Sequence, residues 1–319
     1  MSIAIRFEPG LGAWLMARLD RAESEDSLVR TMTTEGMHGG VARAIVAAFV
    51  SARHAGTEPP RDAIVLDENA LDYVDEPARL LPRRHIETVD RTVQVLLRLD
   101  RPPLAVLDGV LSPSECAEVI RLARPRLAPS TVVDPLSGKD VVAPYRQSYG
   151  AFFHPAENAL IALLEQRVSA IMSLPLENSE GFQVLRYPEG GGSAPHFDFL
   201  EPSNESNRAS LARSGQRVST LVIYLNDVSK GGETVFPELG LSVSPAPGHG
   251  VYFEYANSLG QVDRRSLHAC PPVLRGEKWV LTKWTRERRF ASAGADPAPA
   301  ARSTSSRDSR VNATHDPPR

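Results

Sequence analysis

Short strand-like segments separated by glycine and proline fill the second half of the chain, and they constrain the fold most. Each is rich in Val, Leu, Ile and aromatic residues, the composition that strands favour. Between residues 182 and 284 they read FQVLRY, VSTLVIYL, GGETVF, GVYFEY and KWVLTKW. Segments this short and numerous predict a β-sandwich or a jelly roll.

Two helices are expected before these strands. Ser112, Pro113 and Glu115 supply an N-cap, a first-turn proline and a capping-box glutamate, which together predict a helix start. Cys116 then falls on the apolar face of that helix, so we expect it in the core. A second helix is predicted over residues 156–172, and strands are predicted from Val93 onward. The class is therefore α+β, a jelly roll with flanking helices.

Three regions differ in composition. Residues 1–92 combine a small helical unit, over 11–51, with a polar, proline-bearing linker over 52–92. Residues 93–290 form the strand-rich domain. Residues 291–319 are rich in Ala, Ser, Pro and Arg, which predicts a disordered tail. The first region carries no chemical motif, and we interpret it as a stabilising or docking appendage.

Composition narrows the possible functions. The 319 residues carry a net charge of −3 with a pI near 6.3, so a nucleic-acid partner is not expected. Cys116 and Cys270 are the two cysteines, too few for a disulfide framework or a cysteine zinc cage. The first residues lack the pattern of a signal peptide, and no apolar run reaches about 18 residues. We expect a soluble, cytoplasmic protein without a membrane partner; the sequence leaves the oligomeric state open.

Two histidines and an aspartate form the candidate metal site. His196 and Asp198 lie two residues apart on an expected strand, where alternation places them on one face. His268, shortly before the last strand, is the best third ligand, because His154 and His249 sit in turn-like sequence. Two histidines and one carboxylate leave three iron positions open for a cosubstrate and oxygen. A zinc hydrolase stays an alternative for these ligands alone.

A lysine at the right spacing favours iron. Lys278 follows His268 by ten residues and begins the last strand, where it is placed to hold the distant carboxylate of a cosubstrate. Tyr187 and Tyr224 end two other strands and offer hydroxyl donors. On the last strand, Lys278 is expected to share a face with Val280 and Thr282.

Together these motifs resemble the prolyl 4-hydroxylase family of iron(II)- and 2-oxoglutarate-dependent dioxygenases. The resemblance covers about residues 102–290 and is carried by LRYPEGGGSAPHFD, SGQRVSTLVIYLND, GGETVFPE, SLHACPPV and GEKWVLTKW, in that order. It implies a double-stranded β-helix, which is a jelly roll. The amino-terminal helical segment also resembles one found on some bacterial members.

The resemblance implies roles for ten residues. The iron ligands would be His196, Asp198 and His268, and Lys278 would pair with the far carboxylate of 2-oxoglutarate. The cosubstrate pocket would also include Tyr187, Thr220, Tyr224 and Thr234. The substrate side of the cleft would include Arg217 and Arg286. The implied cofactors are Fe(II), 2-oxoglutarate and O2, with ascorbate as reductant.

Two departures from the family pattern concern the same cleft. Ser193 stands where many relatives have a tyrosine that contacts the substrate proline. The usual His-Ala-Gly-Cys-Pro segment reads His268-Ala269-Cys270-Pro271 here, although the ten-residue step to Lys278 is intact.

The implied activity is hydroxylation of proline in a protein or peptide, coupled to decarboxylation of 2-oxoglutarate to succinate and CO2. Because Ser193 alters the substrate side, hydroxylation of a free or carrier-bound amino acid, or of another side chain, stays open. A non-catalytic binding module is the remaining alternative. The polar stretch 201–216 is predicted to be a mobile loop that covers the substrate.

Overall fold

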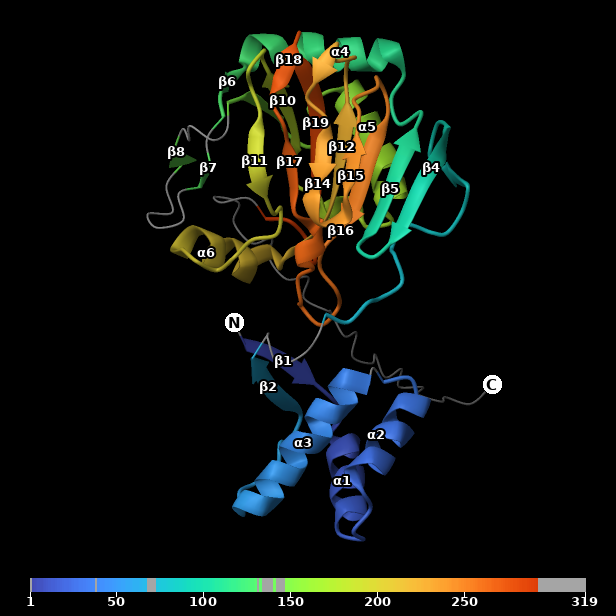
Figure 1. Ribbon diagram of the computed structural model, residues 1–319, viewed down its shortest axis with the longest axis vertical. Coiled ribbons are helices and arrows are strands. Elements are labelled where there is room, and N and C mark those ends of the chain that lie inside the picture. The colour runs from blue at the N-terminus through green and yellow to red at the C-terminus, as the bar shows by residue number, and fades with distance from the viewer. Residues whose placement is uncertain are drawn as a thin grey trace, which may run out of the picture.

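The computed structural model describes residues 2–37, 39–67, 73–130, 132–133, 140–141 and 147–291. A small amino-terminal unit lies below a larger domain of strands and helices (Figure 1). The predicted tail, apart from Ala291, lies outside the described residues. Among the described residues, no helix combines the length and apolar composition needed to cross a membrane.

The amino-terminal unit contains three helices and a two-stranded sheet. Its elements are β1 (Ser2–Arg6), α1 (Pro9–Leu19), α2 (Glu25–Thr34), α3 (Gly39–Ala55) and β2 (Ala63–Asp67). The helices confirm the expectation for residues 11–51. Part of the stretch taken as linker is a strand instead, because β2 pairs antiparallel with β1. Leu259, from the larger domain, packs against the apolar core of this unit.

Two antiparallel sheets form the larger domain and confirm the predicted jelly roll. The nine-stranded sheet has the order β3 (His85–Glu87), β4 (Thr92–Asp100), β5 (Pro103–Asp108), β16 (Gly250–Glu254), β12 (Arg217–Tyr224), β19 (Lys278–Arg286), β10 (Phe182–Tyr187), β9 (Tyr149–Phe153), β6 (Ala128–Pro129). The four-stranded sheet has the order β11 (Ser193–His196), β17 (His268–Cys270), β14 (Thr234–Phe236), β15 (Leu241–Val243). Two short pairs complete the strands: β13 (Lys230–Gly231) with β18 (Val273–Arg275), and β7 (Val132–Val133) with β8 (Asp140–Val141).

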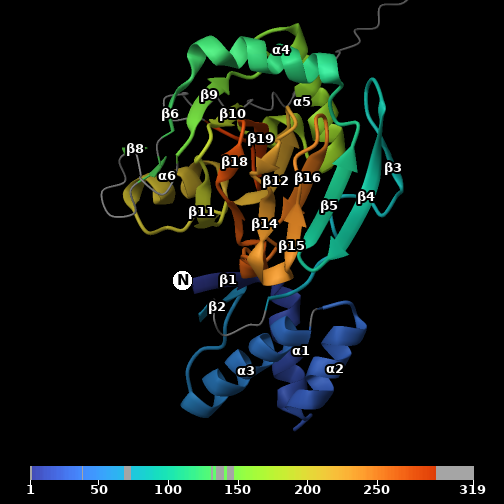
Figure 2. The same ribbon diagram turned by 45° about the horizontal axis from the view of Figure 1, so that its top comes forward.

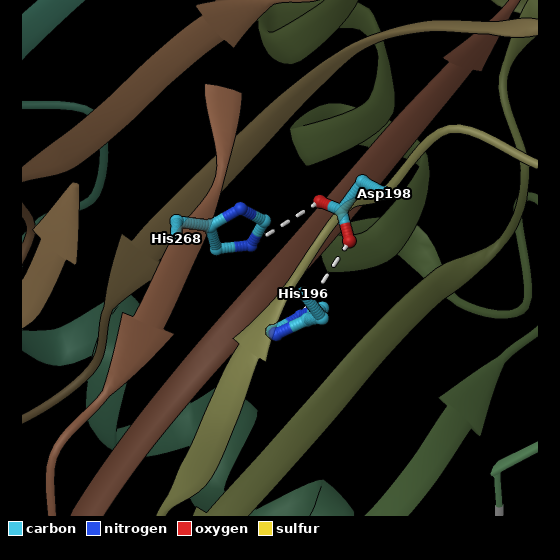
Figure 3. Close-up of side chains that lie close together, drawn as sticks. All are labelled: His196, Asp198 and His268. Carbon is cyan, nitrogen blue, oxygen red and sulfur yellow. Dashed lines mark ion pairs between the residues drawn. The ribbon is translucent and has the colours of Figure 1, made fainter. Parts of the chain in front are cut away.

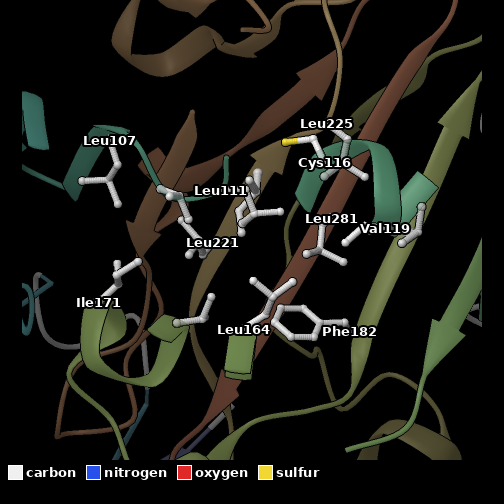
Figure 4. Close-up of a cluster of buried hydrophobic side chains, with 14 of the residues drawn as sticks. Leu107, Leu111, Cys116, Val119, Leu164, Ile171, Phe182, Leu221, Leu225 and Leu281 are labelled. Carbon is white, nitrogen blue, oxygen red and sulfur yellow. The ribbon is translucent and has the colours of Figure 1, made fainter. Parts of the chain in front are cut away.

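Two helices cover the outer face of the large sheet. They are α4 (Pro113–Ala123), which crosses the top of the domain in Figure 2, and α5 (Ala159–Met172). The predicted capping box of α4 is present: the Ser112 hydroxyl accepts from the Glu115 amide at 3.2 Å, and the Glu115 carboxylate accepts from the Ser112 amide at 2.7 Å. Cys116 and Val119 of α4 and Leu164 and Ile171 of α5 are buried in one apolar core with strand residues that include Leu221 and Leu281 (Figure 4).

Alternation along β19 divides its side chains between two environments. Leu281 joins the core under the helices, whereas Val280 packs in a second core between the two sheets. Lys278, Val280 and Thr282 line the same cavity, as the alternation in the sequence predicted. The sheet therefore shields the cavity from the helices, and chemistry is confined to the space between the sheets.

The stretch 201–216, expected to be a loop, contains a helix. α6 (Glu205–Ser214) begins at Asn204, whose side chain accepts from the Asn207 amide at 2.9 Å. The expectation of a loop is therefore wrong, and the missed signal is an N-cap asparagine followed by a first-turn glutamate.

Loss of this cap should weaken the domain measurably. We expect Asn204→Ala to lower the free energy of unfolding by about 1 kcal/mol, because the first turn of α6 loses its side-chain acceptor. Urea denaturation followed by circular dichroism measures the change. Ser206→Ala, an exposed substitution in the same turn, is the matched control. Equal midpoints for the two variants would contradict the role given to Asn204.

Candidate active site

The three candidate metal ligands converge between the two sheets. His196 ends β11, Asp198 follows it, and His268 begins β17, where it is the cross-strand partner of His196. The Nε2 atom of His196 lies 3.8 Å from Asp198 Oδ1, and Nε2 of His268 lies 3.7 Å from Asp198 Oδ2. Figure 3 shows both rings turned toward the carboxylate. The three ligand atoms all lie within 4.8 Å of one another, close enough to share one ion.

Backbone carbonyls orient both imidazole rings. The Nδ1 atom of His196 lies 2.9 Å from the carbonyl oxygen of Ala194, and Nδ1 of His268 lies 3.0 Å from that of Ser266. A carbonyl only accepts, so each Nδ1 donates and each Nε2 keeps its lone pair for a metal. This arrangement, with one carboxylate, is the donor set of mononuclear non-haem Fe(II) sites. The residues therefore fit an iron(II) ion.

A threonine hydroxyl holds the aspartate. Thr220 Oγ1 donates to Asp198 Oδ2 at 2.7 Å, and both residues are buried. Burial acts to raise the pKa of Asp198, but the neighbouring His268, His196 and Arg217 and the Thr220 hydroxyl outweigh it and hold the pKa at about 2. The carboxylate is therefore an anion throughout the physiological range and ready to bind a cation.

Thr220 was expected in the cosubstrate pocket, but its hydroxyl bonds to the aspartate. We expect Thr220→Val to weaken Fe(II) affinity by about 10- to 100-fold, as loss of a hydrogen bond to a metal ligand commonly does. An anaerobic titration with Co(II), followed by its absorption bands, measures the affinity. Thr220→Ser keeps the hydroxyl and should bind metal within a few-fold of the unsubstituted protein. Equally tight binding by the valine variant would exclude this role.

A partly open cavity of about 760 Å³ surrounds the three ligands. Tyr187, Thr234, Cys270 and Lys278 line it, and so do Ser193, Arg217 and Trp284. The candidate anchor and the candidate substrate side therefore share one space with the metal ligands. A cavity of this size is large enough for a small cosubstrate together with part of a second molecule.

Two buried lysines on β19 have different partners. Lys283 lies 3.1 Å from the carboxylate of Glu165, so its charge is balanced. Lys278 is 2% exposed, and its Nζ donates to Cys270 Sγ at 3.2 Å and to Thr234 Oγ1 at 3.5 Å. Within the described part of the chain, no carboxylate lies within ion-pair distance of Lys278. Burial lowers the pKa of Lys278. A buried ammonium that faces a cavity without a counter-ion points to an anionic ligand.

The tyrosines near Lys278 occupy different positions. Tyr187 lines the cavity, with its ring centroid 5.7 Å from Lys278 Nζ. Tyr224 is fully buried and donates to Thr234 Oγ1 at 2.7 Å; burial raises the pKa of its phenol. Tyr224 is not among the residues that line the cavity. It orients the Thr234 hydroxyl, and Thr234 meets the cavity directly.

The structure separates the two arginines assigned to the substrate side. Arg217 lines the cavity, donates to the Asp198 carbonyl at 3.3 Å, and forms two bonds to the Glu180 carboxylate at 2.7 and 2.8 Å. Arg286 is 1% exposed and does not line the cavity. Its guanidinium donates to Glu180 at 3.1 Å and to Ser210 of α6 at 3.0 Å. Its position therefore makes Arg286 a link between α6 and β19 instead of a cavity residue.

Three cavity residues were missed from the sequence. Glu180 pairs with Arg217, and Gln183 and Trp284 line the cavity. Alternation along β10 and β19 puts Gln183 on the same face as Leu185, and Trp284 on the same face as Thr282. The signal available in the sequence was a polar side-chain atom at a position on the otherwise apolar inner face of each strand.

Comparisons with known proteins agree with this geometry. Residues 182–286 match the family model of the 2OG-Fe(II) oxygenase superfamily. The chain is 40% identical over 202 residues to prolyl 4-hydroxylase 1 of Arabidopsis thaliana, a match that covers 59% of this chain and 70% of that protein. It is 38% identical to prolyl 4-hydroxylase subunit alpha-1 of Rattus norvegicus, covering 59% of this chain and 35% of the subunit.

A solved structure is similar to part of this chain. The viral collagen prolyl hydroxylase of Paramecium bursaria Chlorella virus-1, in complex with 2OG, is 27% identical, with a TM-score of 0.46 over 57% of this chain and 95% of that one. The assignment depends on the sequence relatives and the matched family model. On these grounds the chain belongs to the prolyl 4-hydroxylase family of iron(II)- and 2-oxoglutarate-dependent oxygenases.

Proposed function

We propose that this protein hydroxylates proline in a peptide or protein and couples this reaction to the oxidative decarboxylation of 2-oxoglutarate. The observation that carries the proposal is the meeting of the His196, Asp198 and His268 donors in one cavity with the ammonium of Lys278, which has no carboxylate partner among the described residues. Iron(II), when bound by these donors, would supply the activation of O2 that oxidation of an unactivated C–H bond requires.

The protein's own groups position the reactants. Lys278 would hold the far carboxylate of 2-oxoglutarate through a charge-assisted hydrogen bond worth about 1.5–3 kcal/mol. Thr234, oriented by Tyr224, offers a hydroxyl beside that bond. No side-chain base is needed for hydrogen removal from carbon, so the carboxylate of Asp198 is free to act as a ligand alone.

The chemistry of the substrate class and the sequence relatives support a peptide as the substrate. Proline-containing segments are already extended and lose little entropy when they bind. The relatives named prolyl 4-hydroxylase point to the same substrate class.

The position of Ser193 keeps a second substrate class open. Ser193 lines the cavity and its hydroxyl lies 3.5 Å from His196 Nδ1. A serine there leaves room that a tyrosine would fill, which suits hydroxylation of a free amino acid or another side chain. The complete set of ligands and Lys278 argues against a non-catalytic module. A zinc hydrolase would not explain why the buried Lys278 lies in the cavity. The metal content after anaerobic purification tests that alternative.

Succinate release distinguishes the substrate classes. We expect a proline-containing peptide to stimulate it, and the same peptide with alanine in place of proline to leave it at the basal rate. Mass spectrometry should find one added oxygen on the proline. Stimulation by free proline alone would favour the second class. Ascorbate as reductant and a cytoplasmic location remain predictions from the sequence.

A further inference from the structure

Cys270 lies at the anchor itself. It ends β17, two residues after His268, and alternation along a strand puts both side chains on one face. Its Sγ accepts from Lys278 Nζ at 3.2 Å, the shorter of the two hydrogen bonds given above for this ammonium. Cys270 lines the 760 Å³ cavity and also a second, more open hollow of about 460 Å³. The thiol is therefore buried but lies beside Lys278, on the side of the 760 Å³ cavity, which a small molecule can enter.

The two-residue spacing between His268 and Cys270 brings the thiol to Lys278. In the usual His-Ala-Gly-Cys-Pro segment the cysteine stands three residues after the histidine, and on a strand an odd separation turns a side chain to the other face. The ten-residue separation between His268 and Lys278 is unchanged. The lysine therefore keeps its position, and the thiol lies next to it. The buried ammonium that bonds to this thiol has no carboxylate partner among the described residues, which marks this spot as an anion site.

We propose that Cys270 is an oxidation-sensitive modification site that controls access of the cosubstrate carboxylate to Lys278. This inference rests on the proposed function, because it takes 2-oxoglutarate as the anion that Lys278 receives. The oxidant is a small peroxide. The thiol sulfur attacks one peroxide oxygen, an S–O bond forms, the O–O bond breaks, and water leaves with the thiol proton. Sulfur loses two electrons and becomes a sulfenic acid, and hydrogen peroxide is reduced to water.

The product is placed to block the anchor. The new oxygen is bonded to an atom that already accepts from Lys278, so it adds a polar acceptor and extra volume beside the ammonium. An incoming carboxylate would then compete for the same N–H donors. A thiol reductant reverses the change, since two reductant thiols become a disulfide while sulfenic acid returns to thiol and water.

Cys116 provides an internal control. It is 1% exposed in the core beneath α4, and its Sγ lies 3.9 Å from the carbonyl oxygen of Tyr224. It lines neither cavity described above, and burial raises its pKa to about 11. The two cysteines of the chain thus differ in access, and only Cys270 is expected to react.

The test uses the full-length protein loaded with Zn(II) in place of iron, so that peroxide meets no redox-active metal. Hydrogen peroxide is added with and without dimedone, which traps sulfenic acid, and calorimetry measures the dissociation constant of 2-oxoglutarate. We expect dimedone on Cys270, protection of Cys270 by 2-oxoglutarate, and about tenfold or weaker binding after oxidation, a loss of about 1.4 kcal/mol. Dithiothreitol should restore binding. Cys116→Ser should respond like the unsubstituted protein, and Cys270→Ser should keep its own affinity after peroxide.

Three results would overturn the inference: dimedone on Cys116 but not on Cys270, no trapping at either residue, or oxidised Cys270 with unchanged affinity. A protein that never binds 2-oxoglutarate before oxidation would refute the proposed function, and the inference with it. Tight binding before oxidation and equally tight binding after it would refute the inference alone.

Discussion

Asp198→Ala should leave the protein unable to retain iron(II). The substitution removes the only carboxylate of the three-ligand cluster and leaves two neutral imidazoles, so we expect Fe(II) affinity to fall by more than about 100-fold, beyond the range typical of changes outside the ligand set. Iron-dependent succinate release should fall with it. Metal analysis of anaerobically reconstituted protein and a Co(II) titration measure the loss.

The fold should survive this change. Thr220 keeps a hydroxyl partner in Tyr255, at 3.0 Å, after the carboxylate is gone. Asp108→Ala is a suitable control, because Asp108 is partly exposed and pairs with His249 at 3.1 Å, outside the cluster. Stoichiometric iron in Asp198→Ala protein with an unchanged circular dichroism spectrum would show that Asp198 is not a ligand.

Replacement of Lys278 should act on the cosubstrate and spare the metal. We expect Lys278→Met to raise the KM for 2-oxoglutarate by about 10- to 150-fold, which corresponds to the loss of about 1.5–3 kcal/mol of charge-assisted bonding. The kcat at saturating cosubstrate should change much less, because Lys278 is proposed to contact the end of the molecule remote from the metal. Steady-state kinetics at varied 2-oxoglutarate separate the two constants.

Burial makes methionine a suitable replacement. Its unbranched side chain fills the space of the lysine stem without leaving a charge between the sheets. Lys230→Met changes an exposed lysine on β13 and should leave the KM for 2-oxoglutarate unchanged. An unaltered KM in the Lys278 variant would mean that another group receives the carboxylate, and the contrast between Lys278 and Lys283 would then need a different explanation.

Local sequence patterns predicted the parts of the site that depend on one strand at a time. Alternation set Lys278 on the inner face of its strand. The two-residue spacing of His196 and Asp198 marked them as a pair, but the expected strand is wrong there: β11 ends at His196 and Asp198 lies in the bend that follows. The capping signals of α4 likewise act within a few residues. The jelly roll followed from many short apolar segments, since such segments can bury their faces only by packing two sheets together.

Contacts between distant strands were beyond the reach of those patterns. The bond from Thr220 to Asp198 depends on how β12 lies against the segment after β11, and alternation does not determine that placement. Arg286 does not line the cavity, because its guanidinium bonds to Glu180 and Ser210 instead. The pairing of β1 with β2 joins residues about 60 positions apart, so neither segment alone revealed it. Asn204, by contrast, was a local signal that was overlooked.

The carboxylate of Glu180 is shared by two arginines with different duties. Arg217 bonds to Glu180 and also donates to the carbonyl oxygen of Asp198. Arg286 bonds to Glu180 and also donates to Ser210 in α6. Through Glu180, helix α6 and the main chain at Asp198 therefore belong to one continuous network of hydrogen bonds.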